Sequence, residues 1–137
     1  MIKTYKFKLY QNKNSRKYLE EQLFIASNIY NHCIALYKRY YKLFKKHLNN
    51  NKIQKHITKL KKLKKYNFWN KLNSQTIQDV TQRIDKSYKA FFNNLKNKNK
   101  RKISPPSFKK YINYKSITFK QTGYKFLEDL NKIIINK

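Results

Sequence analysis

The sequence is poor in residue types on which several protein classes depend. Its 137 residues include one cysteine, one glycine and two prolines. A single cysteine, Cys33, excludes a disulfide framework and a cysteine-based zinc site within the chain. A single glycine, Gly123, excludes a glycine-rich phosphate loop. The sequence contains no run of 18 apolar residues and opens with no signal peptide, so it predicts neither a membrane span nor secretion.

Acidic residues are scarce. Six Asp and Glu face 34 Lys and Arg, which gives a formal net charge of +28. Two-metal nucleases need several carboxylates that converge on a cation, whereas the spacing here predicts helix-surface and turn positions. The six are Glu20, Glu21, Asp79, Asp85, Glu128 and Asp129. Because Cys33 falls on an apolar stripe and the three histidines lack partner ligands, we expect no catalytic residue, metal site or cofactor in this chain.

The charge indicates the kind of partner. Aromatic residues make up 16% of the chain, which argues against disorder. A folded chain with this surplus of lysine indicates a polyanion. An A/T-rich genome would explain why Lys outnumbers Arg, but it would not explain the scarcity of acids. Binding to an anionic membrane surface is an alternative. We expect no membrane partner, because the apolar stripes suit a helical core, and we expect a cytoplasmic location.

Apolar periodicity predicts a strand followed by three helices. Alternation of Tyr5, Phe7 and Leu9 with polar residues predicts a strand over 2–10. Stripes with helical spacing predict helices over 15–48, over 52–66, and from Asn73 or Ser74 to about 95. In the connection 67–73, Phe68 and Trp69 are expected to contact the core.

The strand signal returns after two consecutive prolines. Pro105 and Pro106 end the helical region, because proline forces extended backbone. Residues 116–120 and 132–136 are typical of short strands, with turns at Gly123 and 127–131. The sequence therefore predicts an α+β fold that is mostly helical, in which the two ends pair into one small sheet and the helices form an insertion.

Lysines interleaved with aromatic residues favour contact with nucleic acid. Lysine neutralises phosphates, and aromatic rings stack on bases. One such set lies on the basic face of the first strand and another at and after the tip that follows the third helix. The two sets are Lys6, Lys8 and Tyr10, and Lys98, Lys100, Arg101, Lys102, Lys109 and Lys110.

Three segments together resemble a known family. They are the opening KTYKFKLY, the step Ile29-Tyr30-Asn31, and the stretch Leu72 to Leu95 followed by PPSFKK. In this combination the sequence looks like the N-terminal part of TnpB, also called OrfB, the accessory transposase of bacterial insertion sequences. The resemblance covers essentially all 137 residues.

The resemblance implies more than the composition does. Proteins of this family are RNA-guided DNA endonucleases whose N-terminal region is a wedge of strands, OB-like, split by an inserted helical recognition lobe. The implied domains are a first wedge strand at 1–11, a three-helix lobe at 12–103 with a helix-turn-helix-like start, and a second wedge segment at 104–137. The implied partners are guide RNA and target DNA. By position, the residues that read the DNA motif beside the target would be Ser74, Gln75, Gln78, Lys120 and Gln121.

The sequence departs from the family in one respect. The family's RuvC-like nuclease domain, with its three acids, and its four-cysteine zinc module have no counterpart in these residues. We therefore expect a transposase-type module that binds nucleic acid without cleaving it, in the cytoplasm at the bacterial nucleoid. The alternatives are a non-functional remnant of a disrupted insertion sequence, or one half of a split protein whose nuclease half is a separate chain.

Overall fold

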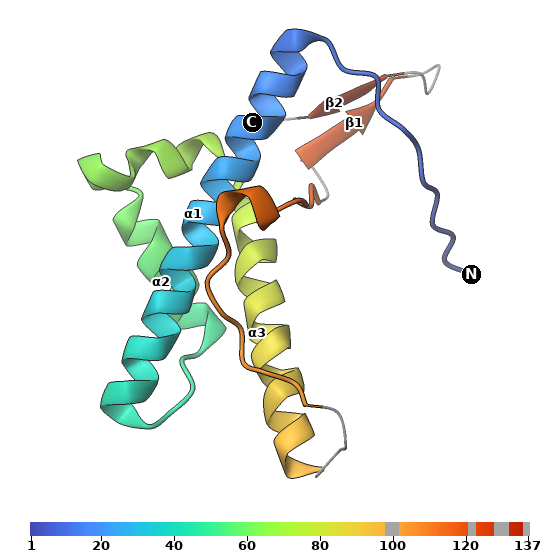
Figure 1. Ribbon diagram of the computed structural model, residues 1–137. Coiled ribbons are helices and arrows are strands. Elements are labelled where there is room, and N and C mark those ends of the chain that lie inside the picture. The colour runs from blue at the N-terminus through green and yellow to red at the C-terminus, as the bar shows by residue number, and fades with distance from the viewer. Residues whose placement is uncertain (98–101, 121–122, 128–131, 136–137) are drawn as a thin grey trace.

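A computed structural model describes residues 1–97, 102–120, 123–127 and 132–135. Helices dominate these residues: α1 spans Lys13–Phe44, α2 spans Asn50–Leu60 and α3 spans Ser74–Lys96. Two 3-10 helices, η1 at Lys64–Lys71 and η2 at Tyr111–Asn113, lie between and after them. The expectation of a mostly helical fold with a small sheet is confirmed (Figure 1).

The core lies where α1, α2, η1 and α3 meet. Helix α1 supplies the largest share, and Ile29, Cys33 and Ile34 are fully buried in it. The apolar stripe that predicts this helix is buried in the middle of α1 but not at its end, where Phe44 is 57% exposed. Trp69 of η1 is also fully buried, as the sequence predicted, and its indole nitrogen donates a hydrogen bond to Asn28 Oδ1 at 3.1 Å.

An asparagine is the N-cap of each of the three α-helices. The side chains of Asn12, Asn49 and Asn73 each accept a hydrogen bond from a backbone N–H of the first turn. Asn73 rather than Ser74 is thus the N-cap of α3, and Ser74 is its first helical residue. The second helix ends at Leu60, earlier than predicted, and the chain continues as η1 through most of the segment expected to be irregular.

The strand predicted for residues 2–10 is wrong. Residues 1–12 form neither helix nor strand, and residues 1–12, here called the arm, are exposed (Figure 1). The alternation does survive locally, since the rings of Tyr5 and Phe7 stack with centroids 6.3 Å apart. A strand needs a hydrogen-bonded neighbour as well as alternation, and the described strands pair only with each other.

The sheet is smaller than expected. Strand β1, Tyr124–Phe126, pairs antiparallel with β2, Ile133–Ile135, and Lys125 lies opposite Ile134. The strand predicted near 132–136 is therefore present, whereas β1 lies in a segment for which no strand was predicted. The strand predicted at 116–120 is wrong, because that segment lies along α3 and is bound to it by hydrogen bonds from side chains.

A long irregular segment, residues 102–120, crosses the helices and is here called the strap. In Figure 1 it is the orange segment that runs back from the end of α3 across α3 and α1. The hydroxyl of Tyr30 donates to the Ser107 carbonyl oxygen at 3.0 Å. Further along, Tyr111 packs its ring edge-on against Phe24 of α1, with centroids 5.7 Å apart. The strap is therefore part of the packed structure, even though it contains only one turn of 3-10 helix.

Candidate nucleic-acid interface

The four described carboxylates are all held by cationic side chains. Glu20 pairs with Arg16, and Glu21 pairs with Lys71. Asp79 and Asp85 lie on α3, the helix expected there, and pair with Arg83 and Lys89, the cations one turn further along, at 2.7 and 2.8 Å. Asp79 also pairs with Lys120 at 3.3 Å. Because these acids are already paired, most lysines in the described part of the chain have no carboxylate to offset their charge.

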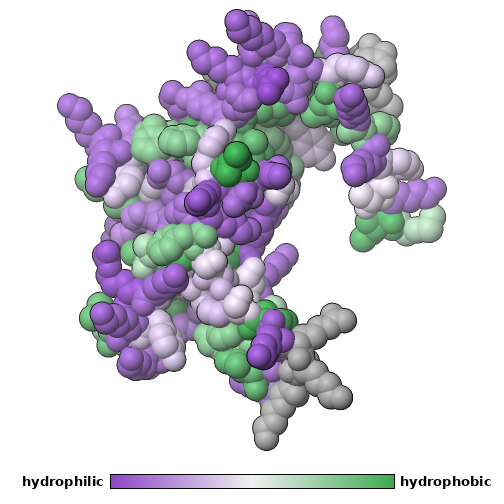
Figure 2. Space-filling model, in the orientation of Figure 1, coloured by the Kyte–Doolittle hydropathy of each residue, from purple (hydrophilic) through white to green (hydrophobic). Residues whose placement is uncertain are grey.

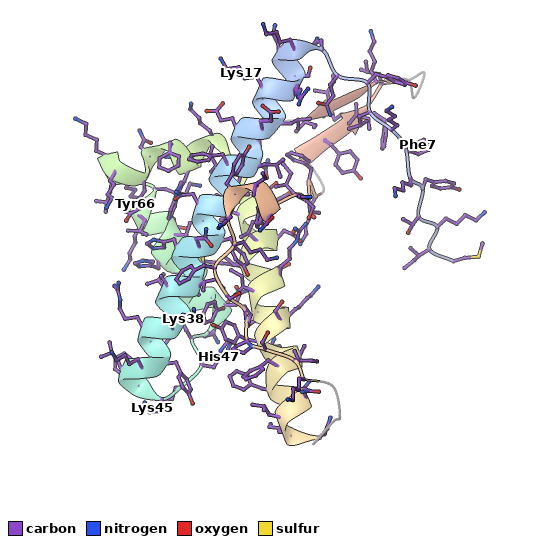
Figure 3. The ribbon with its side chains drawn as sticks, in the orientation of Figure 1. Phe7, Lys17, Lys38, Lys45, His47 and Tyr66 are labelled. Carbon is purple, nitrogen blue, oxygen red and sulfur yellow. The ribbon has the colours of Figure 1, made fainter. Side chains whose placement is uncertain are left out.

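Hydrophilic side chains cover most of the face that Figure 2 displays. The labelled lysines in Figure 3 come from both ends of α1: Lys17 lies near its beginning, and Lys38 and Lys45 lie toward its end. Lys38 also places its ammonium group 4.4 Å from the ring centroid of Phe108 in the strap. The positive charge is therefore spread over the helices and the strap and not confined to a tail.

A groove of about 600 Å³ separates the polar faces of α2 and α3 and is here called the α2–α3 groove. Its floor is apolar and comes from Ile57 and Ile77. Its walls carry amides, hydroxyls and ammonium groups. The polar lining residues are Asn51, Gln54, Lys55, Thr58, Lys59, Lys61, Ser74 and Gln78. Side chains of these types can hydrogen-bond base edges and pair with phosphates.

Helical spacing aligns the groove residues. Gln54 and Thr58 are one turn apart on α2, as are Lys55 and Lys59, because residues four apart share a helix face. Ser74 and Gln78 have the same spacing on α3. The hydroxyl of Thr58 donates to the Gln54 carbonyl oxygen at 3.0 Å. Two of the expected site residues thus face a row of α2 residues that sequence reasoning missed, although their i, i+4 spacing opposite Ile53 and Ile57 was visible.

Burial lowers the pKa of one lysine of the groove, Lys61. The Lys61 side chain is partly buried, and this desolvation lowers its pKa. A phosphate beside it would favour the charged form and reverse part of that shift. Lys61 is therefore a cation that an anionic ligand in the groove would stabilise.

A second, smaller hollow lies between α1, α3 and the strap. Its volume is about 220 Å³, and Tyr30, Arg83, Lys109 and Lys115 are among the residues that line it. The Lys109 ammonium group lies 5.3 Å from the centroid of the Tyr30 ring. Burial raises the pKa of Tyr114, which also lines this hollow, to about 12, so its phenol stays protonated at neutral pH.

The other expected site residues lie in different surroundings. Lys6, Lys8 and Tyr10 are exposed on the arm, on which Figure 3 labels Phe7. Lys102 and Lys110 are exposed on the strap. Lys120 is bound to α3, where it donates to Gln82 Oε1 at 2.9 Å as well as pairing with Asp79. Gln75 is half-buried. Lys98, Lys100, Arg101 and Gln121 lie outside the described residues.

Three further findings concern the described residues. No three His, Cys, Asp or Glu side chains among them are grouped as a metal site requires. Cys33 is fully buried, and this burial raises the pKa of its thiol to about 12, so the reactive thiolate is disfavoured. None of the helices described is both long and apolar enough to cross a bilayer.

Comparison with known families agrees with the resemblance at the N-terminus. The family model HTH_OrfB_IS605, a helix-turn-helix domain, matches residues 1–46. In the structure these residues comprise the arm and α1, and the next helix begins at Asn50, just beyond the match. No curated protein matches the chain. The similarity to the N-terminal helix-turn-helix domain of OrfB/TnpB-type insertion-sequence proteins is confirmed for this third of the sequence.

Proposed function

We propose, from the match of residues 1–46 to the OrfB-type helix-turn-helix domain, that this chain is a nucleic-acid-binding module of a transposase-related protein. The observation that carries the proposal is the pairing of every described carboxylate with a cation. The four described acids each pair with cations of the same chain, so most of the lysines behind the net charge of +28 have no carboxylate partner. Positive charge of this size on a folded surface attracts the phosphate backbone.

Duplex DNA is the first proposed ligand, and the α2–α3 groove is its proposed reading site. Gln78 and Ser74 present an amide and a hydroxyl that can hydrogen-bond base edges. Lys55 and Lys59 on the opposite wall can pair with the flanking phosphates. The two kinds of contact predict different losses, since base contacts affect one sequence and phosphate contacts affect all.

Guide RNA is the second proposed ligand, and it rests on the resemblance to the family. The OB-like wedge, the inserted recognition lobe and the domain division 1–11, 12–103 and 104–137 are proposals on the same basis. They are supported by the hairpin β1–β2, whose Phe126 and Ile134 are about half exposed and leave apolar surface for a further layer. We propose that cleavage belongs to a nuclease domain outside these residues, in a separate chain or otherwise, and that the protein acts in the cytoplasm at the nucleoid.

The experiment is fluorescence anisotropy with labelled duplexes and RNA. We expect Gln78→Ala to weaken binding to a preferred duplex, found by selection from a random pool, by about tenfold while leaving other duplexes unchanged. Lys55→Gln with Lys59→Gln should weaken binding to all duplexes alike. Gln11→Ala, a change of the same kind on the arm, is the control. If the wild-type chain binds neither duplex DNA nor RNA, the proposal is wrong.

A further inference from the structure

We propose that the hollow beneath the strap is a binding pocket for a single phosphate group. This phosphate pocket is defined by Arg83 and Ser87 of α3 and by Lys109, Asn113, Lys115 and Ser116 of the strap. The proposal rests on the nucleic-acid binding proposed above for its natural ligand, and on the pocket's own geometry for the chemistry.

The charge of the pocket selects an anion. Three of its lining residues are cationic, and no carboxylate lines it. The acid that pairs with Arg83 is Asp79, which contacts Arg83 Nε at 2.7 Å and Lys120 at 3.3 Å. Asp79 is thus paired with two cations and does not line the pocket, so the lining keeps a positive surplus from Lys109 and Lys115.

The donors of the pocket suit phosphate oxygens. The ammonium groups of Lys109 and Lys115 form no ion pair with a described carboxylate, and both residues are exposed. The hydroxyl of Ser116 and the amide of Asn113 add donors around the same space, whereas the Ser87 hydroxyl already donates to the Arg83 carbonyl oxygen at 2.9 Å. A phosphate oxygen accepts several such bonds at once, and bonds to charged donors are the strongest of them.

The walls are held in place before any ligand arrives. Asn31 fixes the backbone of Lys109 with two hydrogen bonds, at 2.8 and 2.9 Å. Arg83 donates to the carbonyl and the hydroxyl of Ser116, and its second terminal nitrogen donates to Thr118. A binding site that is already ordered loses less conformational entropy when it binds.

The size of the pocket limits the ligand. Pockets for drug-sized molecules have about 300–1,000 Å³, whereas this one has about 220 Å³. It suits one phosphate and its immediate substituents. That phosphate is either an internal phosphodiester of a bound strand or a terminal phosphate, and these share the same recognition chemistry.

The first experiment uses inorganic phosphate and the full chain. Lys109→Gln with Lys115→Gln removes two charges from the pocket, and Lys62→Gln with Lys64→Gln removes two exposed charges elsewhere. In titration calorimetry at constant ionic strength, we expect the pocket variant to bind phosphate about tenfold more weakly than wild type. The control variant should bind as wild type does. An equal loss in both variants, or no phosphate binding by wild type, would overturn the proposal.

The second experiment separates the two sources of phosphate. Oligonucleotides with a 5′-phosphate or a 5′-hydroxyl are compared for binding to the same variants. A terminal ligand predicts tighter binding of the phosphorylated form, lost in the pocket variant. An internal ligand predicts equal binding of the two forms and a greater loss in the pocket variant than in the control. Equal losses of oligonucleotide binding in both variants contradict the pocket but leave the proposed function intact. Binding of inorganic phosphate without binding of any oligonucleotide contradicts the proposed function but leaves the pocket intact.

Discussion

The side-chain amide of Asn31 forms two hydrogen bonds with the backbone of Lys109. Its nitrogen donates to the Lys109 carbonyl oxygen at 2.8 Å, and its oxygen accepts from the Lys109 N–H at 2.9 Å. Asn31 belongs to the Ile29-Tyr30-Asn31 step and Lys109 to the PPSFKK segment, 78 residues further along. Two sequence motifs that resemble the family thus have a joint structural role, which is to fasten the strap to α1.

Loss of this contact should loosen the strap. We expect Asn31→Ala to lower the free energy of unfolding by about 1–2 kcal/mol, since two hydrogen bonds contribute about 0.5–1.5 kcal/mol each. We also expect faster trypsin cleavage after Lys109. Urea denaturation and timed proteolysis measure the two effects. Asn14→Ala, at an exposed position early in α1, is the control. Equal cleavage rates in the two variants would show that Asn31 does not hold the strap.

Trp69 should be the most costly single residue to truncate. It is fully buried, and its ring contacts His32, Tyr66 and Phe68. We expect Trp69→Ala to cost about 3–5 kcal/mol, because it leaves a large cavity and an unpaired Asn28. Trp69 is the chain's one tryptophan, so its fluorescence is absent from the variant. Circular dichroism is therefore used to measure the unfolding. Phe24→Ala, on a half-exposed aromatic residue of α1, provides the comparison and should cost clearly less.

His32 should make the fold less stable at acidic pH. Burial lowers its pKa below the usual 6.5, and the nearby charges of His56, Arg39 and Lys65 lower it further. The unfolded chain therefore takes up this proton more readily than the folded one, so the stability is present above pH 6.5 and is lost as the pH falls through the folded pKa.

Thermal unfolding at pH 7.5 and at a series of lower pH values tests this effect. His32→Gln should flatten the loss of stability below pH 6.5, and His56→Gln should flatten it in part, because it removes one source of repulsion. A His32→Gln variant that loses stability with pH as steeply as wild type would contradict the assignment.

Ionised Asp85 should stabilise the fold, and this contribution should be lost at a lower pH than that of His32. Burial raises its pKa, but the hydrogen bonds and charges of Lys89 and His47 outweigh burial and hold the pKa below 3.8. Its contribution is thus present above pH 3.8 and is lost as the pH falls through the folded pKa. His47, labelled in Figure 3, lies in the connection between α1 and α2, and its Nε2 is 3.3 Å from Asp85 Oδ1 of α3.

Chemical denaturation of Asp85→Asn at pH 7 and pH 3 measures that contribution. We expect a loss of about 1–3 kcal/mol at pH 7 and a smaller loss at pH 3. Glu20→Gln is the matched control, because its pair with Arg16 is exposed and is expected to contribute below about 0.5 kcal/mol. A loss that is the same at both pH values would refute the role of the charge.

Periodicity located the helices because each buries a stripe that is visible in the sequence. Ile77, Val80 and Ile84 follow that rule and are buried. Pattern was insufficient for residues 2–10, whose alternation predicts a strand, and for residues 116–120, whose composition is typical of one; neither segment forms a strand. Alternation gives side-chain direction but not a partner, and Thr118 is bound instead by Thr76 and Arg83 of α3.

The candidate interface was predictable only in part. The net charge and the start of α3 were visible in the sequence, and both remain in the proposals. The α2 wall of the groove and the pocket beneath the strap depend on how distant segments pack. Arg83 illustrates the difficulty: its pair with Asp79 follows from their i, i+4 spacing, whereas its hydrogen bonds to Ser116 and Thr118 depend on how the strap packs.

The most direct test of the central claim is the salt dependence of DNA binding. The association constant for a random duplex is measured at several salt concentrations from about 50 to 200 mM. Because the net charge is +28 and the described acids are paired internally, we expect many phosphate contacts. Six to ten contacts predict an affinity that falls by about 10³–10⁵ over this range. A salt-independent affinity, or no binding at the lowest salt, would contradict the claim that this surface binds nucleic acid.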